Sequence, residues 1–431
     1  MRRGAALALA LAALVPAAPP ASAKGLEIKI AGGEGQLRRI IAPRQSLESV
    51  LVIRFGAGYA DEASVHGGTL VAVHALLSMH RRVKYGDLLE TMHGATPRLT
   101  TSVGPHETVF TLRAHRDEMM GAANQLVTAL LEPAFDAPAY AAAVERAAVD
   151  GAPRSPLDEL LGRLSMFTFT SDARYRPEVD AERLESLTWP TAKRFVETMF
   201  CPANATAIAA GGFNPAAMEA LLARHSGGER NTFRPPKLTL PMNHRFHTRD
   251  ESHLFYFPLD LSDAEKVAAA RVLVELLEDR VGTRLRRLPS SFQVEARAVA
   301  QAPFKGVTVW LPEHASAGTD LSAHVRQEVQ AFREGRDTAE QLTAARDDAV
   351  RRFQQVDARP ELLAEEILAG LDAAPDWVGA DAQAALEKMD AKKLVELLGP
   401  QLLPEKSVHL FFSPEVSSTE ATAFTDGEVP R

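Results

Sequence analysis

The chain has 431 residues, of which 46% are hydrophobic and 24% are charged. These values are those of an ordinary globular protein, and they exclude a disordered chain, a fibrous repeat and a small disulfide-rich scaffold. The net charge is −8 with both signs interspersed, which argues against a nucleic-acid-binding protein, because such proteins usually present a basic face. The single cysteine, Cys201, excludes an intramolecular disulfide and a zinc site built from thiolates.

The first 23 residues have the pattern of a secretory signal peptide. A basic start (Met-Arg-Arg) precedes a short Ala- and Leu-rich stretch, and Ala-Ser-Ala at 21–23 forms a small-x-small cleavage site. The apolar stretch is shorter than the roughly 20 residues that a spanning helix needs, so we expect no membrane insertion. We expect an exported mature chain that starts at Lys24. The periplasm is favoured because a chain without disulfides gains nothing from an oxidising space.

The first half of the mature chain alternates strand and helix patterns that are punctuated by Gly and Pro. Alternating or short apolar runs predict strands, and longer runs with helical periodicity predict helices. The predicted strands are 27–30, 37–41, 47–55, 100–102, 108–113 and 205–210. The predicted helices are 69–79, 85–92, 117–131, 138–149, 156–169, 191–199 and 215–224.

The second half repeats this order after a segment at 226–241 that is rich in Gly and Pro and is typical of a linker. The recurring order indicates a distant internal duplication. We predict an α+β fold with two homologous α/β-sandwich domains, 24–225 and 242–412, each a mixed or antiparallel sheet covered by helices, and a mobile polar tail at 413–431. The predicted strands of the second half are 253–258, 293–300, 306–311 and 408–412, and the predicted helices are 263–278, 321–333, 338–355, 360–371 and 381–398.

Several short motifs follow one another along the chain, most of them in the first half. They are Arg-Phe-Gly-Ala-Gly at 54–58 with Glu62, Gly-Gly-Thr at 67–69, Gly-Ala at 94–95, Thr-Ser at 101–102, Glu-Thr-Val-Phe at 107–110, Glu-Arg at 145–146, Leu-Glu-Ser-Leu-Thr at 184–188, Pro-Ala-Asn at 202–204, Gly-Thr-Arg-Leu at 282–285 and the segment 335–342. In order and spacing they resemble the pitrilysin/insulinase-type family of zinc peptidases, which includes the mitochondrial processing peptidases. The resemblance covers most of residues 25–412.

Active members of that family carry an inverted zinc motif, His-x-x-Glu-His, in which two imidazoles one helical turn apart bind the ion and the Glu acts as general base. If the Gly-Thr pair marks the helix start, the ligand positions fall on Val71 and Ala75, and the base falls on His74. A shift of one residue places the ligands at Leu70 and His74, with Val73 as the base.

The family completes its ligand set with a second Glu from a later helix, and the nearest carboxylate here is Asp150. Aliphatic side chains do not coordinate zinc, and a lone neutral imidazole holds it weakly. We therefore expect no catalytic residue, no metal site and no cofactor in this chain. The alternative is an atypical metal site formed by convergence of other histidines, and the candidates are His66, His80, His93, His106 and His115.

The resemblance also implies residues that contact a peptide. The family's second half supplies an Arg and a Tyr that hold the substrate carbonyl, and Arg286 and Phe292 lie near those positions, although Phe292 lacks the hydroxyl and Arg286 lies in a basic run typical of a solvated face. An edge strand near Ala95, Thr101 and Ser102 is expected to bind an extended peptide through backbone hydrogen bonds.

In this family a closed chamber is made of two such two-domain halves, and the present chain has the length of one half-chamber. The sequence therefore predicts a non-catalytic subunit that binds peptide and forms a chamber with a homologous, zinc-bearing partner. Two alternatives stay open. One is an active metallopeptidase with atypical ligands, and the other is a stand-alone peptide-binding or scaffold protein.

Overall fold

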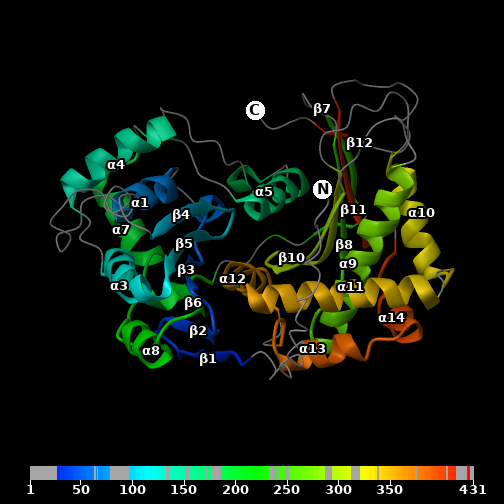
Figure 1. Cartoon of the computed structure of the whole chain (residues 1–431). Coiled ribbons are helices and arrows are strands. Elements are labelled where there is room, and N and C mark those ends of the chain that lie inside the picture. The colour runs from blue at the N-terminus through cyan, green and yellow to red at the C-terminus, as the bar shows by residue number, and fades with distance from the viewer. Residues whose placement is uncertain are drawn as a thin grey trace, which may run out of the picture.

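The computed structural model contains two six-stranded sheets, one from each half of the chain (Figure 1). It describes residues 27–62, 65, 67–77, 97–132, 136–150, 155–169, 172–175, 184, 186–232, 236, 238–240, 242–247, 252–286, 294–311, 321–336, 339–373, 376–403, 406–413 and 425–427. Within these ranges, no helix combines the length and the hydrophobicity needed to cross a bilayer.

The first sheet has the strand order β1-β2-β6-β3-β5-β4. Strands β2 and β6 are parallel, and all other neighbours are antiparallel, including the hairpin that pairs β1 with β2. The strands are β1 (Lys29–Ala31), β2 (Arg38–Pro43), β3 (Glu48–Phe55), β4 (Arg98–Val103), β5 (Thr108–His115) and β6 (Ala205–Gly211). Each lies where the sequence predicts it, displaced by at most a few residues.

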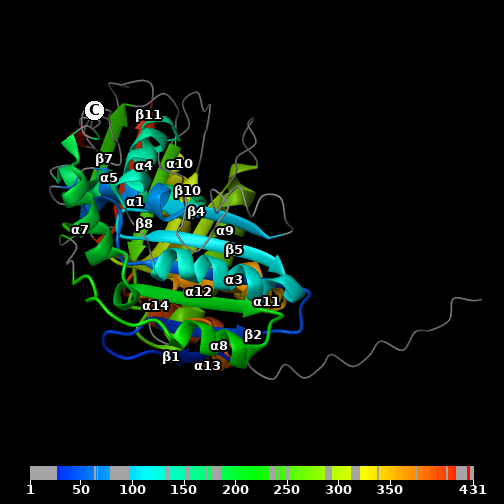
Figure 2. The ribbon, with the colours of Figure 1, turned by 90° about the vertical axis from the view of Figure 1, so that its left-hand side faces the viewer.

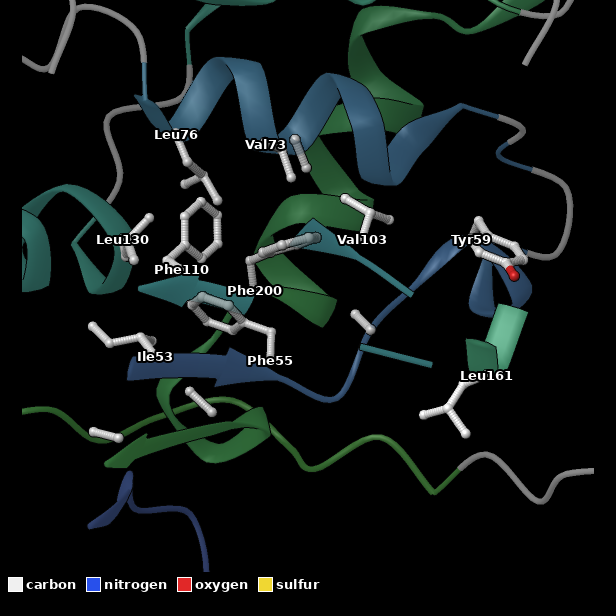
Figure 3. Packing of buried hydrophobic residues seen from close by; sticks show 14 of the residues in the cluster. Ile53, Phe55, Tyr59, Val73, Leu76, Val103, Phe110, Leu130, Leu161 and Phe200 are labelled. Atoms are coloured by element: carbon white, nitrogen blue, oxygen red, sulfur yellow. The ribbon is translucent and has the colours of Figure 1, made fainter. Parts of the chain in front are cut away.

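Helices cover the face of this sheet that points away from the second half, with α3 and α8 in front of the strands in Figure 2. Val73 and Leu76 of α1 point toward Phe110 in Figure 3, and the ring of Phe55 contacts Phe200 with centroids 5.0 Å apart. The helical segments of this half are η1 (Tyr59–Asp61), α1 (Gly68–Leu77), α3 (Arg116–Leu131), α4 (Ala137–Asp150), α5 (Pro156–Thr168), η2 (Ala173–Tyr175), α7 (Trp189–Met199), η3 (Pro202–Asn204) and α8 (Pro215–Ala223). The helix predicted at 85–92 lies outside the described residues.

The second sheet has the order β12-β7-β11-β8-β10-β9. Its strands are β7 (Met242–His247), β8 (Ser252–Pro258), β9 (Glu295–Gln301), β10 (Phe304–Leu311), β11 (Val408–Ser413) and β12 (Thr425–Gly427), and its helices are α9 (Ala264–Leu285), α10 (Leu321–Arg333), α11 (Ala339–Ala358), α12 (Pro360–Ala369), α13 (Ala380–Glu387) and α14 (Ala391–Leu398). Matching strands β2 to β6 with β7 to β11 in sequence order gives the same spatial order and the same polarities in both sheets. This agreement supports the predicted duplication.

The second half differs from the sequence-based prediction in several features, and one of them is that α9 runs to Leu285 although the helix was predicted to end at residue 278. The helix predicted over 381–398 is two helices, because Asp390 accepts a hydrogen bond from the backbone N–H of Lys393 at 2.8 Å and so starts α14 anew. Strand β7 was not predicted, because Met242–His247 is polar and rich in His. Within the segment predicted as a mobile tail, Thr425–Gly427 pairs with β7 as strand β12.

One helix of each half packs on the sheet of the other half. Helix α5 of the first half packs on the second sheet, where the ring of Phe167 lies 4.3 Å from that of Phe246 and 4.8 Å from that of Phe412. Helix α12 of the second half packs on β3 and β6 of the first sheet. Both helices lie between the two sheets in Figure 1. Each apolar core therefore contains side chains from both halves.

Candidate functional site

The helix that the resemblance links to zinc binding is α1, and three of its four candidate ligand positions carry aliphatic side chains. Leu70, Val71 and Ala75 are buried and pack in one apolar cluster with Ala143 and Ala147 of α4. Val73 lies in the larger core of the first sheet. The contact between α1 and α4 is thus closed by aliphatic side chains, which have no lone pair to offer a cation.

His74 and Asp150 are the polar residues at which the sequence analysis sought a ligand. His74 lies half-buried on α1, and Asp150 is the last residue of α4. In either register of the zinc motif, His74 is the one imidazole on α1, and the remaining ligand positions of the helix are aliphatic. This set of donors does not fit a catalytic zinc ion. Among the described residues, no three His, Cys, Asp or Glu side chains converge in a way that could hold a metal.

The other histidines considered for a metal site have structural partners or lie outside the described residues. His106 lies between Asp61 and Tyr175, with Nδ1 3.2 Å from Asp61 Oδ1 and Nε2 2.9 Å from the Tyr175 hydroxyl. His115 caps α3 by accepting a hydrogen bond from the Asp117 N–H. The residues of this group that are not described are His66, His80 and His93. The Asp61–His106–Tyr175 chain was not predicted, because its members come from three separate loops and short helices.

Glu62 fixes the start of α1. Its carboxylate is buried and accepts hydrogen bonds from the backbone N–H groups of Gly67 at 2.7 Å and Thr69 at 3.0 Å, two of the donors that the first turn of a helix leaves without partners. The hydroxyl of Thr69 donates in turn to the Gly58 carbonyl at 3.1 Å. The acidic residue after the Gly-Ala-Gly turn is therefore a capping group for α1.

Burial raises the pKa of Glu62 from 4.5 to about 7, although its hydrogen bonds lower it. The folded state then binds a proton more tightly than the unfolded state. Proton binding by Glu62 therefore stabilises the folded state fully below about pH 4.5, and this stabilisation is lost as the pH rises through about 7. Between pH 5 and pH 8 we expect the wild type to lose about 2 kcal/mol of unfolding free energy relative to Glu62→Gln, as measured by urea denaturation. The exposed Glu118→Gln is the control, and a pH-independent difference between wild type and Glu62→Gln would contradict the prediction.

Strand β4, the predicted peptide-binding strand, lies at the edge of the first sheet and pairs with β5 on one side only. Thr101 and Ser102 are both on β4, and both line a cavity of about 680 Å³ between the two halves. Ala95 lies outside the described residues. Two of the predicted peptide-contacting residues, Thr101 and Ser102, therefore lie at a cavity that residues of the second half also line.

The remaining predicted contacts lie elsewhere. Arg286 follows α9 as its C-cap, with a side chain that is 70% exposed and a guanidinium 3.9 Å from the Asp279 carboxylate. It is not among the residues that line the cavity. Phe292 lies outside the described residues. Other lining residues, such as Arg113 and Glu365, escaped the sequence analysis, because no local motif signals that β5 and α12 meet.

No protein-family model matches the sequence, and no curated protein matches it. The fold matches solved structures. A peptidase M16 inactive domain from Pseudomonas fluorescens aligns with a TM-score of 0.68 and 14% identity over 91% of this chain and 99% of that chain. Pitrilysin aligns with a TM-score of 0.65 and 14% identity over 92% of this chain but 45% of its own length. The periplasmic protease PqqL from Escherichia coli aligns with a TM-score of 0.59 and 13% identity over 90% of this chain and 48% of that chain. At these identities the likeness concerns the fold, and the chain has the fold of one half of an insulinase-type peptidase.

Proposed function

We propose that the protein is a non-catalytic, peptide-binding subunit that forms half of a peptidase chamber with a homologous zinc-bearing partner. The observation that carries the proposal is the corner between α1 and α4. At the positions where the zinc motif would supply ligands, Leu70, Val71 and Ala75 are buried in an aliphatic cluster. Helices α1 and α4 still pack against each other here, but they do so through aliphatic side chains and not through a set of metal ligands. In the proposed pair, zinc and the general base belong to the partner.

Peptide binding is supported by the position of β4. An edge strand presents backbone N–H and C=O groups that an extended peptide can pair with, as in β-augmentation. The residues of β4 also lie beside the cavity between the halves, so a bound peptide would have side-chain space next to it.

Pairing with a second half is supported by the lengths of the matched proteins. The chain spans about half of pitrilysin and of PqqL. An interface of roughly 1,600 Å² in total would offset the entropy lost on association. The exposed guanidinium of Arg286 is suited to donate hydrogen bonds to a carbonyl or carboxylate of a peptide held between the two chains. We also propose export to the periplasm, on the basis of the N-terminal signal pattern.

We expect the purified chain to contain no stoichiometric zinc and to cleave no peptide alone, and we expect turnover when it is mixed with a homologous chain that carries an intact His-x-x-Glu-His motif. Elemental analysis, a peptide-library digest and sedimentation of the two chains, alone and mixed, measure these outcomes. Arg286→Ala is expected to weaken peptide affinity and to leave assembly unchanged.

Two results would overturn the proposal. About one zinc per chain, lost in His74→Ala, would establish the chain as a metallopeptidase with atypical ligands. A partner that is fully active alone and forms no complex at micromolar concentration would exclude the subunit role and leave stand-alone peptide binding.

A further inference from the structure

Two histidines form a hydrogen-bonded pair inside the second half. Nδ1 of His253 on β8 lies 3.2 Å from Nε2 of His409 on β11, and the two residues are 4% and 2% exposed. The ring planes differ by 18° and the ring centroids are 5.5 Å apart, so the imidazoles meet edge to edge through these nitrogens. Neither residue lies on β4 or lines the cavity between the halves. The pair is therefore a buried titratable group that the proposed function does not use.

The sheet holds both imidazoles in place. Strands β8 and β11 are inner neighbours in the second sheet (Figure 1), and their register places His409 opposite Phe255 and His253 opposite Phe411. In each cross-strand pair the ring planes lie within 12° of each other, with centroids 4.0 Å apart in the first pair and 4.4 Å apart in the second. Each imidazole therefore has a phenyl ring stacked on one face and lies inside the apolar core.

This position favours neutral imidazoles. In an N–H···N hydrogen bond one ring donates and the other must be unprotonated in order to accept, so the pair holds only while at least one ring is neutral. The neighbouring elements contribute cations: Arg326 of α10 acts on His409, and Arg245 of β7 lies over the ring of Phe411 at 4.8 Å. Burial first, and then His253 and Arg326, hold the pKa of His409 well below its ordinary value of 6.5.

A buried neutral imidazole makes the folded state sensitive to acid. A histidine of the unfolded chain takes up a proton at about pH 6.5, whereas His409 of the folded chain resists protonation there. Because the folded-state pKa is lowered, the stabilisation is fully present above about pH 6.5 and is lost as the pH falls below that value. The unfolding equilibrium constant should rise about tenfold for the first pH unit below 6.5. This sign is opposite to that expected for Glu62, whose pKa is raised.

We propose that the His253–His409 pair is an acid-sensitive switch, which holds β8 and β11 together at neutral pH and loosens their contact when it is protonated. Side chains alternate along a strand, so Leu254 and Leu410 point to the opposite face of the sheet. There they belong to the core that also contains Phe167 of α5. Protonation of the pair would therefore also weaken the seat of the helix that the first half places on this sheet. The switch lies within this chain and does not depend on the proposed partner.

The test compares the wild type with His409→Gln by urea denaturation of the full chain at pH 7.5 and pH 5.5. Glutamine places an amide near the position of the imidazole Nε2 and takes up no proton in this range. Relative to His409→Gln, the unfolding equilibrium constant of the wild type should rise about tenfold between the two pH values. Leu410→Val, the next residue along β11, is the matched control. It removes packing without removing a titratable group, so it should keep the pH dependence of the wild type.

Two measurements on the wild type do not depend on the folding of a variant. Long-range proton–nitrogen NMR spectra report the protonation of each imidazole, and we expect the His409 ring to be neutral at pH 5.5. Hydrogen exchange, corrected for the intrinsic rate, should show that β8 and β11 lose protection at pH 5.5 before the strands of the first sheet do. The proposal is overturned if the His409 ring of the folded chain is protonated at pH 5.5, or if protection falls equally in both halves. It is equally overturned if the wild type and a folded His409→Gln share one pH dependence.

Discussion

Replacing Glu107 with alanine is expected to lower the free energy of unfolding by about 3–5 kcal/mol. The Glu107 carboxylate is buried between the two halves, where it lies 2.9 Å from Nε of Arg54 and accepts hydrogen bonds from Gln301 of β9 at 3.2 and 3.3 Å. Without it, the ion pair that Arg54 keeps among the described residues is the longer one with Asp372, at 3.7 Å. An uncompensated buried cation is costly, so the loss exceeds that of an ordinary hydrogen bond.

Urea denaturation at pH 8 measures this effect, since burial raises the pKa of Glu107 to about 7 and the carboxylate is ionised at pH 8. The double variant Arg54→Met/Glu107→Leu removes both charges and should cost clearly less than the single change. Glu159→Ala, which breaks the exposed pair with Arg163 on α5, should cost less than about 1 kcal/mol. A Glu107→Ala loss of that same small size would contradict the prediction.

Replacing Phe167 with alanine is expected to cost about 3–5 kcal/mol, as for other large buried rings. Phe167 is the contact through which α5, a helix of the first half, packs on the second sheet between Phe246 and Phe412. Because the two cores share helices, we expect the wild type to unfold in a single transition. Phe167→Ala should separate the unfolding of the two halves by weakening the helix that joins them.

Calorimetry together with near-ultraviolet circular dichroism measures both the stability and the number of transitions. Phe167→Leu keeps most of the apolar volume and should cost less than Phe167→Ala. Val149→Ala, on an exposed face of α4, should lie within about 0.5 kcal/mol of wild type. Two well-separated transitions already present in the wild type would show that the exchanged helices do not couple the halves.

The sequence by itself determined the elements and their repetition. Hydrophobic periodicity and Gly or Pro punctuation are local signals, so they located the hairpin of β1 and β2, the start of α1 near Gly68 and the order of strands in both halves. The identity of the side chains on α1 also predicted that three of its four candidate ligand positions are aliphatic, since helix spacing needs no tertiary information. The predicted helix boundaries were wrong where a single N-cap residue determines them, as at Asp390, which begins α14.

Only the tertiary structure decided which helix covers which sheet. The sequence shows that α5 and α12 are amphipathic, but an apolar face does not specify which sheet it will cover. In the structure, each of the two helices packs on the sheet of the other half. The same exchange brings residues of β4, such as Ser102, and residues of α12, such as Leu368, to line one cavity. Residues more than 250 positions apart come to share one environment through such packing, because burial and charge balance depend on neighbours in space.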